Sequence, residues 1–327
     1  MFQILVEPNP SAGRASRNWI ASVAIGEAHF AEWERYAKDS VIAYARCYGL
    51  GAVVFTDALD EREDRKHPAW QKLLVGRAFR EVDPEAHGVL FLDTDVVANP
   101  LTGRDVFEVW NPERIGMVSQ RIGMPYAYFD TAKRICFQRN RFVTPTYPLD
   151  SVFLFTLDQV YGHEGLAPMA DECCTGFFVF SVERHGEFLA DIYERYRNHG
   201  ETLALEQTHL NYHVQEAGFY QRLDYSFQVI WVYEMAQKYP FLYRPEFRDN
   251  ESLVRECVGA SLLSGTFLHF AGRWNESGTM KYGPEFLCAG WEKSLEQFAD
   301  YLQRDVRGVA RGMLNPPDEH FTRNRPA

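Results

Sequence analysis

The sequence predicts an α/β fold in which helices flank a central sheet. Three apolar, strand-like stretches, at 19–26, 52–59 and 87–97, alternate with two stretches of helical periodicity, at 31–49 and 67–82. Strands that alternate with helices belong to a parallel sheet, because each helix returns the chain to the same edge of the sheet. The chain has 327 residues, 46% of them hydrophobic, and can therefore bury a substantial core.

The elements follow in order along the chain. The first strand ends at Gly26, the helix over 31–49 is expected to end at Gly49, and the helix over 67–82 opens near Pro68. Later strands are predicted at 114–120, 176–183 and 266–272, with a helix at 203–218 that Gly218 ends. We expect a long loop region over 121–170, which is rich in Pro, Tyr and Gly, and a tail over 316–327 after a single domain over 1–315.

Charge and composition exclude several classes of protein. The net charge is −11, whereas nucleic-acid binding needs a basic face, so no nucleic-acid footprint is expected. No apolar stretch is long enough to span a bilayer, and the first residues lack the basic segment of a signal peptide. The six cysteines are scattered, which indicates reduced thiols and a cytoplasmic protein.

Two carboxylates follow the buried strand in the segment HGVLFLDTDVVANP. Asp93 and Asp95 come directly after an apolar run, and burying two anions is costly unless a cation pairs with them. Gly26 and Asp57 lie at the ends of two other predicted strands, and ligands of α/β sheets bind beyond such ends. The pattern predicts a binding site at this edge. The alternative is a surface turn in which Asp93 caps backbone N–H groups.

A series of short motifs between about Trp19 and Gly272 resembles the retaining GT-A glycosyltransferases. The similarity is to the branch of glycogenin, the bacterial lipopolysaccharide galactosyltransferases and the plant and fungal galactosyl- and xylosyltransferases. The motifs, in chain order, are VAIGEAHFAEWERYAKDSVIAYARCYG, FTDAL, WQKL, LFLDTDV, CTGFFVFS, LEQTHLN and LHFAG. The resemblance implies a GT-A fold, which is a Rossmann-like mixed central sheet flanked by helices. The N-terminal half would bind a nucleotide-sugar and the C-terminal half an acceptor.

By this resemblance, Asp93, Asp95 and His269 would bind Mn²⁺ or Mg²⁺, and the ion would hold the diphosphate of the nucleotide-sugar donor. The residues implied in donor binding are Ile25, Gly26, Asp57, Lys72, Arg77, Thr94, Gly272 and Arg273. Asp57 would meet the base, which favours uracil over guanine. Lys72 or Arg77 would contact the diphosphate, as would Arg273 or Lys281. A core histidine is the alternative for His269, and a solvated helix face is the alternative for Lys72.

The catalytic residues implied by the resemblance lie in the motif LEQTHLN. Gln207 would stabilise the oxocarbenium-like state, and Glu206 stands where the family usually has Asp. Thr208 takes a position that is often acidic in the family, which argues against a covalent intermediate there. The resemblance of LALEQTHLN to the retaining pattern through Gln207, Leu210 and Asn211 implies retention. Asp171 and Glu172 form a second acidic pair that would contact the donor sugar, serve as an inverting base, or cap the end of a loop.

Two other functions fit parts of the sequence. The segment FLDTDVV also resembles the nucleophile motif of haloacid-dehalogenase phosphatases, but that motif normally follows the first strand of its domain. A non-catalytic protein that binds nucleotide-sugars or glycans on the same scaffold is the other alternative, since a fold alone does not fix function. The acceptor would be a glycan, a lipid-linked sugar or another small molecule.

Overall fold

The structure is a computed structural model that describes residues 1–9, 17–101, 103–143, 154–200, 202–272 and 279–285. The chain divides into one compact unit over Met1–Pro284 and a second over Glu285–Ala327. Beyond Glu285, the second unit lies outside the described residues, as do the predicted boundary at residue 315 and the tail. The elements described below all begin within the first unit.

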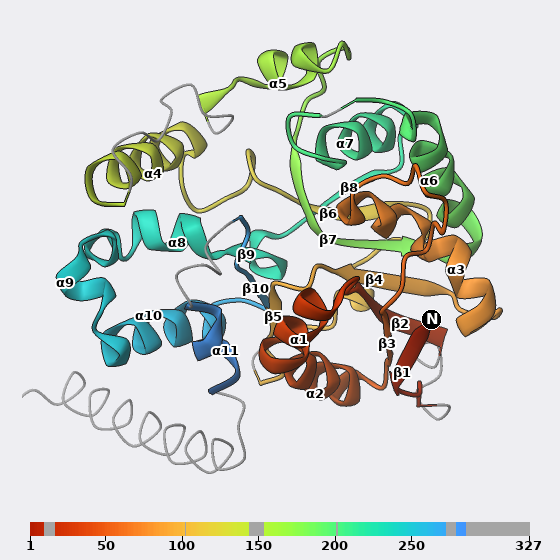
Figure 1. The fold of residues 1–327 in the computed structure, drawn as a ribbon, viewed down its shortest axis with the longest axis horizontal. Coiled ribbons are helices and arrows are strands. Elements are labelled where there is room, and N and C mark those ends of the chain that lie inside the picture. Colours follow the sequence, from red (N-terminus) through yellow and green to blue (C-terminus); the bar gives the residue numbers. More distant parts are fainter. Residues whose placement is uncertain (10–16, 102, 144–153, 201, 273–278, 286–327) are drawn as a thin grey trace, which may run out of the picture. The chain divides into compact units, whose positions relative to one another are not determined.

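The central sheet has seven strands in the order β1-β3-β2-β4-β7-β6-β8 (Figure 1). They are β1 (Phe2–Val6), β2 (Asn18–Val23), β3 (Gly51–Phe55), β4 (Gly88–Leu92), β6 (Ile115–Ser119), β7 (Cys173–Ser181) and β8 (Tyr220–Leu223). The predicted β2, β3 and β4 run parallel, whereas β1 runs antiparallel to β3 and β7 runs antiparallel to both β4 and β6. The mixed central sheet flanked by helices is therefore confirmed, and the three strands predicted from the alternation of strands and helices form its parallel part.

A second sheet of three short strands adjoins the end of β4. It consists of β5 (Val96–Ala98), β10 (Phe267–His269) and β9 (Val229–Ile230), with β10 in the middle. β10 pairs antiparallel with β5 and parallel with β9. The segment between β4 and β5 thus joins the two sheets, and this segment contains both aspartates of the Asp-x-Asp motif.

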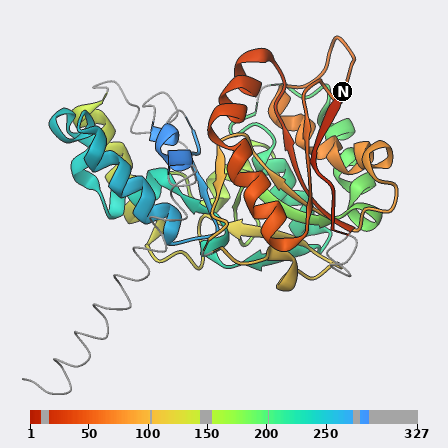
Figure 2. The same ribbon diagram turned by 90° about the horizontal axis from the view of Figure 1, so that it is seen from below.

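Helices cover both faces of the central sheet (Figures 1 and 2). The main apolar cluster packs one face of the sheet, including Trp19, Phe91 and Phe178, against the 3₁₀ helix η2 (Pro68–Leu74), α3 (Val75–Val82), α6 (Val182–Tyr196) and α7 (Gln207–Glu216). On the other side, α2 (Lys38–Tyr48) contacts β1, β2 and β3, and α1 (Glu27–Tyr36) precedes it. Burial of these apolar side chains is the main stabilising contribution to the fold.

A group of helices lies beside the sheets in both views (Figures 1 and 2). It contains α4 (Tyr128–Phe142), α8 (Trp231–Gln237), α9 (Pro245–Arg248) and α10 (Glu251–Leu263). The remaining helical elements are η3 (Val106–Glu108), α5 (Leu157–His163), η5 (Tyr225–Phe227), η6 (Pro240–Tyr243), η8 (Thr279–Lys281) and α11 (Tyr282–Glu285). None of the helices in the described ranges combines the length and apolar character needed to cross a bilayer.

Several predicted elements need correction. Instead of one helix over 31–49, the structure has α1 and α2, which are separated by a turn at Ala37. The first of them begins at Glu27, earlier than predicted. The segment over 67–82 starts as a 3₁₀ helix before it becomes α3. The region 121–170 contains α4 and α5 rather than only loop, while 144–153 lies outside the described residues. The predicted end at Gly49 is confirmed by its left-handed φ of 68°.

Candidate functional site

The Asp-x-Asp motif and His269 meet because the segment between β4 and β5 is held both by β7 of the central sheet and by β10 of the second sheet. β4 ends at Leu92, and the backbone N–H of Asp93 donates to the carbonyl of Gly176 on β7 at 2.9 Å. Antiparallel pairing of β10 with β5 sets His269 opposite Val96, the residue after Asp95. The N–H of Phe270 donates to the carbonyl of Asp95 at 2.9 Å. One ligand atom from each of Asp93, Asp95 and His269 therefore lies within 4.8 Å of the others.

Two cations neutralise these carboxylates. Lys72 Nζ lies 2.8 Å from Asp93 Oδ1 and 2.9 Å from Glu206 Oε1, and its side chain is 4% exposed. His269 Nε2 lies 3.1 Å from Asp95 Oδ1. Burial alone would lower the pKa values of Lys72 and His269, but the neighbouring carboxylates outweigh burial and raise both. Desolvation raises the pKa of Asp93 against the opposing effect of Lys72, whereas His269 keeps the pKa of Asp95 below its ordinary value.

The ring of His269 is fixed by neighbours on its other side. Its Nδ1 lies 2.9 Å from Gln228 Nε2 and 3.5 Å from Cys174 Sγ. Gln228 is fully buried, and its Oε1 has no hydrogen-bond partner among the described residues. The amide therefore has an unused acceptor beside the ring. If the amide turned over, Oε1 would accept from Nδ1–H and leave Nε2 free to bind a metal, which is the usual arrangement of a metal-bound histidine.

Gly176 leaves the space between His269 and Asp93 open. A Cβ atom built at this position would lie 2.3 Å from His269 Cε1, 2.7 Å from His269 Nε2 and 3.0 Å from Asp93 Oδ2. Real Cβ atoms essentially never approach so closely, so only glycine fits here without movement of the site. Two carboxylates and one imidazole are a donor set that suits Mn²⁺, and these residues fit such an ion.

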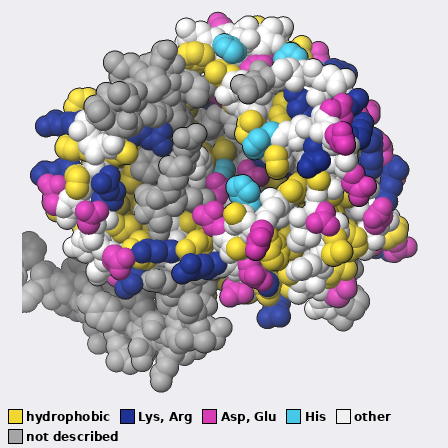
Figure 3. All heavy atoms as spheres, in the orientation of Figure 1, with side chains coloured by type: hydrophobic (Ala, Val, Ile, Leu, Met, Phe, Trp, Pro, Cys, Tyr) yellow, Lys and Arg dark blue, Asp and Glu magenta, His cyan; other side chains and the backbone are white. Residues whose placement is uncertain are grey.

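The cluster opens into a pocket of about 450 Å³ at the carboxyl ends of β2 and β4. The lining comes from the end of β2, from α1, from η2 and from the Asp-x-Asp segment, and it comprises Val23, Ile25, His29, Glu32, His67, Pro68, Ala69, Lys72, Phe91, Asp93, Thr94, Asp95 and Gly272. Acidic and histidine side chains gather around a hollow near the middle of the face drawn in Figure 3. Of the residues expected to bind the donor, Ile25, Lys72, Thr94 and Gly272 are therefore at the pocket.

Among the described residues, three others that were expected to bind the donor do not line this pocket. Gly26 stands just before α1 with a φ of 94°. Asp57 is 62% exposed in its side chain and pairs with the amino group of Met1 at 3.0 Å. Arg77 on α3 pairs with Glu187 on α6 at 2.9 Å, so Lys72 rather than Arg77 is the basic residue beside the aspartates. Arg273 lies outside the described residues.

A chain of polar contacts extends from Lys72 to the start of α7. Glu206 is 3% exposed, and its Oε1 accepts a hydrogen bond from Thr175 Oγ1 at 2.7 Å as well as contacting Lys72. Gln207 Nε2 donates to Glu172 Oε1 at 3.0 Å. Glu172 Oε2 in turn accepts from Arg121 Nε at 2.8 Å. The structure thus places two sets of polar contacts at the start of α7. Glu206 reaches the carboxylate cluster through Lys72, and Gln207, the next residue, contacts Glu172.

Asp171 has different surroundings from Glu172. Its carboxylate accepts hydrogen bonds from Ser119 Oγ at 2.5 Å, from Tyr220 OH at 2.7 Å and from the backbone N–H of Glu172 at 2.8 Å. The residue is 2% exposed. These contacts tie together the ends of β6, β7 and β8, which is what a loop-end cap does.

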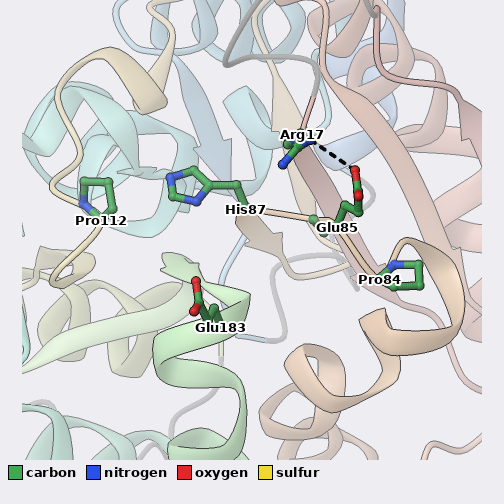
Figure 4. A pocket seen from close by; sticks show the side chains of 7 residues that line it. Arg17, Pro84, Glu85, His87, Pro112 and Glu183 are labelled. Atoms are coloured by element: carbon green, nitrogen blue, oxygen red, sulfur yellow. Dashed lines mark ion pairs between the residues drawn. The ribbon is translucent and has the colours of Figure 1, made fainter.

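A larger hollow, of about 710 Å³, lies at the opposite end of β4 (Figure 4). It is lined by Arg17, Pro84, Glu85, Ala86, His87, Pro112 and Glu183, and Arg17 pairs with Glu85 at 3.1 Å. None of the residues predicted to form the site lines it. Because ligands of α/β sheets bind at the carboxyl ends of the strands, the smaller pocket is the better candidate.

Sequence reasoning missed Gln228, Thr175, Gly176 and Arg121 as parts of the site. Gln228 has a detectable signal, since it is a single amide in the apolar run FQVIW. Gly176 lies in a predicted strand, where an isolated glycine suggests a close approach of another group. Thr175 and Arg121 carry no such signal, because their partners Glu206 and Glu172 are 31 and 51 residues away in the sequence.

No protein-family model and no curated protein matches the sequence. Among solved structures, the chain is similar to a glycosyltransferase involved in the glycosylation of the major capsid of PBCV-1, with a TM-score of 0.48 and 14% identity over 81% of this chain and 98% of that one. It is also similar to the WbbM bifunctional glycosyltransferase, with a TM-score of 0.42 and 12% identity over 78% of this chain and only 45% of that one. For the galactosyltransferase LgtC with donor and acceptor sugar analogs, the TM-score is 0.41 and the identity 11%, over 83% of this chain and 97% of that one.

Proposed function

We propose that the protein is a metal-dependent glycosyltransferase that moves a sugar from a nucleotide-sugar to a glycan or other small acceptor. A UDP-sugar is the first candidate for the donor. The observation that carries this proposal is the meeting of Asp93, Asp95 and His269 at the carboxyl end of β4, beside Lys72 and at a pocket of about 450 Å³. A pocket of this volume is in the range of small-molecule sites.

Asp93, Asp95 and His269 would hold the divalent ion, and Gly176 keeps their side chains free of a colliding Cβ. When bound, such an ion stabilises the negative charge that develops on a departing diphosphate. Lys72 supports the same chemistry from the protein side, because its raised pKa keeps it charged at neutral pH. Its ammonium group lies beside Asp93, where it would also attract the diphosphate.

The residues near Gln207 favour retention of the anomeric configuration. An inverting transferase usually needs a carboxylate that is free to deprotonate the acceptor. Glu172 is 1% exposed and contacts both Arg121 and Gln207, and Asp171 accepts three hydrogen bonds. Neither carboxylate is therefore free to act as a base in this arrangement. Gln207 would present its amide dipole to the transition state instead.

The decisive experiment is a donor screen. The protein is incubated with Mn²⁺ and a panel of UDP-, GDP- and other nucleotide-sugars, and the release of nucleotide is measured. We expect slow hydrolysis of one donor, loss of that activity in Asp95→Asn, and unchanged activity in Asp249→Asn, which removes an exposed carboxylate that lies 3.9 Å from Arg248. Binding of the nucleotide without turnover of any donor or acceptor would favour the non-catalytic alternative. Turnover of an aryl phosphate that depends on Asp93 would favour the phosphatase.

The stereochemical part of the proposal has its own test. Once the donor and an acceptor are known, the anomeric proton of the product is examined by NMR, and an α-linked product from an α-linked donor is expected. Gln207→Ala should lower turnover by about 10²-fold, the size of effect expected when one dipole that stabilises a transition state is removed. A β-linked product would refute retention and redirect the search for a base to Asp171 and Glu172.

A further inference from the structure

A second cluster of side chains that could hold a metal ion lies near the start of α7. Glu164, His199 and His209 each place one ligand atom within 4.8 Å of the other two. They come from three separate elements: Glu164 follows α5, His199 follows α6, and His209 is in the first turn of α7. Figure 1 shows α7 beside α6 with α5 nearby, and α7 contacts both helices.

The side chain of His209 lacks the partners that a buried imidazole normally has. It is fully buried, and neither Nδ1 nor Nε2 has a hydrogen-bond partner among the described residues. Glu164 Oε2 lies 3.9 Å from Nε2, which is beyond hydrogen-bond length. Burying a polar group without a hydrogen-bond partner costs free energy. A metal ion bound to Nε2, the ring nitrogen that faces Glu164, would remove this cost.

We infer that Glu164, His199 and His209 bind a divalent transition-metal ion, with Zn²⁺ as the best match. Two imidazoles and one carboxylate are a donor set that Zn²⁺ readily accepts. In tetrahedral coordination, two ligand atoms that are each about 2.0 to 2.1 Å from a zinc ion lie about 3.4 Å apart. The 3.9 Å between His209 Nε2 and Glu164 Oε2 would therefore have to shorten by only about 0.5 Å when the ion binds. His199 is exposed, which gives the ion an entry path and leaves a coordination position for water.

Neighbouring groups orient two of the three ligands. The backbone N–H of Leu203 donates to Glu164 Oε1 at 2.6 Å, which leaves Oε2 directed to the histidine. Lys66 Nζ donates to the carbonyl oxygen of His199, and to that of Gly200 at 3.3 Å, so it fixes the backbone that carries the exposed ligand. Such outer contacts are typical of metal sites.

The position of the cluster suggests a structural role for the ion. An ion held by all three residues would join the ends of α5 and α6 to the first turn of α7. The same turn begins with Glu206 and Gln207, so the ion would also stabilise the backbone from which these two residues project. The inference itself does not depend on the proposed glycosyl transfer, because it concerns a separate set of ligands.

The test is Zn²⁺ binding by the full chain in an Asp95→Asn background, which removes one of the three ligands of the competing set of Asp93, Asp95 and His269. We expect calorimetry to show one Zn²⁺ per chain. Adding His199→Ala should weaken binding by at least about tenfold, whereas adding His163→Ala should leave it unchanged. His163 is a matched control because it is an exposed histidine whose Nδ1 lies 3.6 Å from Oε1 of Glu164 but which is not one of the three clustered ligands. Both variants alter exposed side chains, so both are expected to fold.

A second measurement separates a metal site from a simple packing cluster. Zn²⁺ should raise the unfolding temperature of the Asp95→Asn protein and of its His163→Ala derivative, but not that of the His199→Ala derivative. In the absence of metal, the unfolding temperatures of the two derivatives should be alike. Failure of the Asp95→Asn protein to bind Zn²⁺, or equal binding by the His199→Ala derivative, would overturn the inference. Neither outcome would bear on donor turnover.

Discussion

Replacing Gly176 by Ala tests whether the space between His269 and Asp93 is a metal site. The new Cβ would lie 2.3 Å from His269 Cε1, while ordinary contacts begin at 3.4 Å, so the ring must move by about 1 Å. Metal–ligand distances tolerate only about 0.2 Å of error, so such a shift removes His269 as a ligand. We expect the affinity for UDP in the presence of Mn²⁺ to fall by at least about 100-fold, or about 2.7 kcal/mol.

The same substitution also overpacks the protein, which is expected to cost about 1 to 3 kcal/mol of stability. Gly116→Ala is the matched control, because a Cβ there would lie 2.6 Å from Val179 Cγ1, 2.9 Å from Leu223 Cδ1 and 3.2 Å from Trp110 Cδ1, which are its three nearest atoms and are all carbons. Denaturant unfolding should show comparable losses in the two variants, while calorimetry should show a loss of Mn²⁺-dependent UDP binding in Gly176→Ala alone. Wild-type binding by Gly176→Ala, or an equal loss in Gly116→Ala, would refute the reasoning.

Three further predictions concern Gln228 and Lys72, which contact the carboxylate cluster, and Asp60, which pairs with Arg62. Gln228→Leu should weaken Mn²⁺ binding by about 10- to 100-fold, measured by calorimetry, because the amide orients His269; unchanged affinity would show that the amide only fills space. Lys72→Met should cost about 2 to 4 kcal/mol in denaturant unfolding without metal, because it leaves Asp93 without its cation; Mn²⁺ should restore part of this loss, and no restoration would argue against a metal at Asp93. Hydrogen bonding to Arg62 lowers the pKa of Asp60 to about 2, so Asp60 stabilises the fold above pH 4 and loses this effect as the pH falls toward 2. The stability difference between wild type and Asp60→Asn should therefore shrink by about 1 to 2 kcal/mol between pH 6 and pH 2, a modest figure because Arg62 is partly exposed; a constant difference would contradict it.

The strands that build the site were predictable because their side chains are buried on both faces. β2, β3 and β4 read as apolar runs, and the two aspartates mark the end of β4. The helix α4 was missed because the prediction used the composition of the whole region 121–170. The prolines and glycines of this region all lie outside Tyr128–Phe142, so they do not interrupt the helix. The break at Ala37 was missed because apolar residues continue on both sides of it.

The polar part of the site was only partly predictable. Asp93, Asp95 and His269 were expected together from the family resemblance, whereas residue spacing alone does not bring residues 95 and 269 into contact. The contact of Lys72 with Glu206 joins residues 134 positions apart and depends on how η2 and α7 both pack on the same face of the sheet. Propensity and periodicity describe single elements, so contacts of this kind follow only from the packed fold.

The charges of the site indicate why a metal and a diphosphate would bind together. With Asp93, Asp95 and Glu206 ionised and with Lys72 and His269 protonated, this cluster would hold three negative charges and two positive ones. One negative charge is left unbalanced, and it would repel a diphosphate. If His269 gave up its proton and became a ligand of a divalent ion, the cluster would be neutral and the repulsion would disappear. The diphosphate would then supply the negative charge that the ion and Lys72 attract. Each ligand should therefore strengthen the binding of the other, and by linkage the two effects must be equal in free energy.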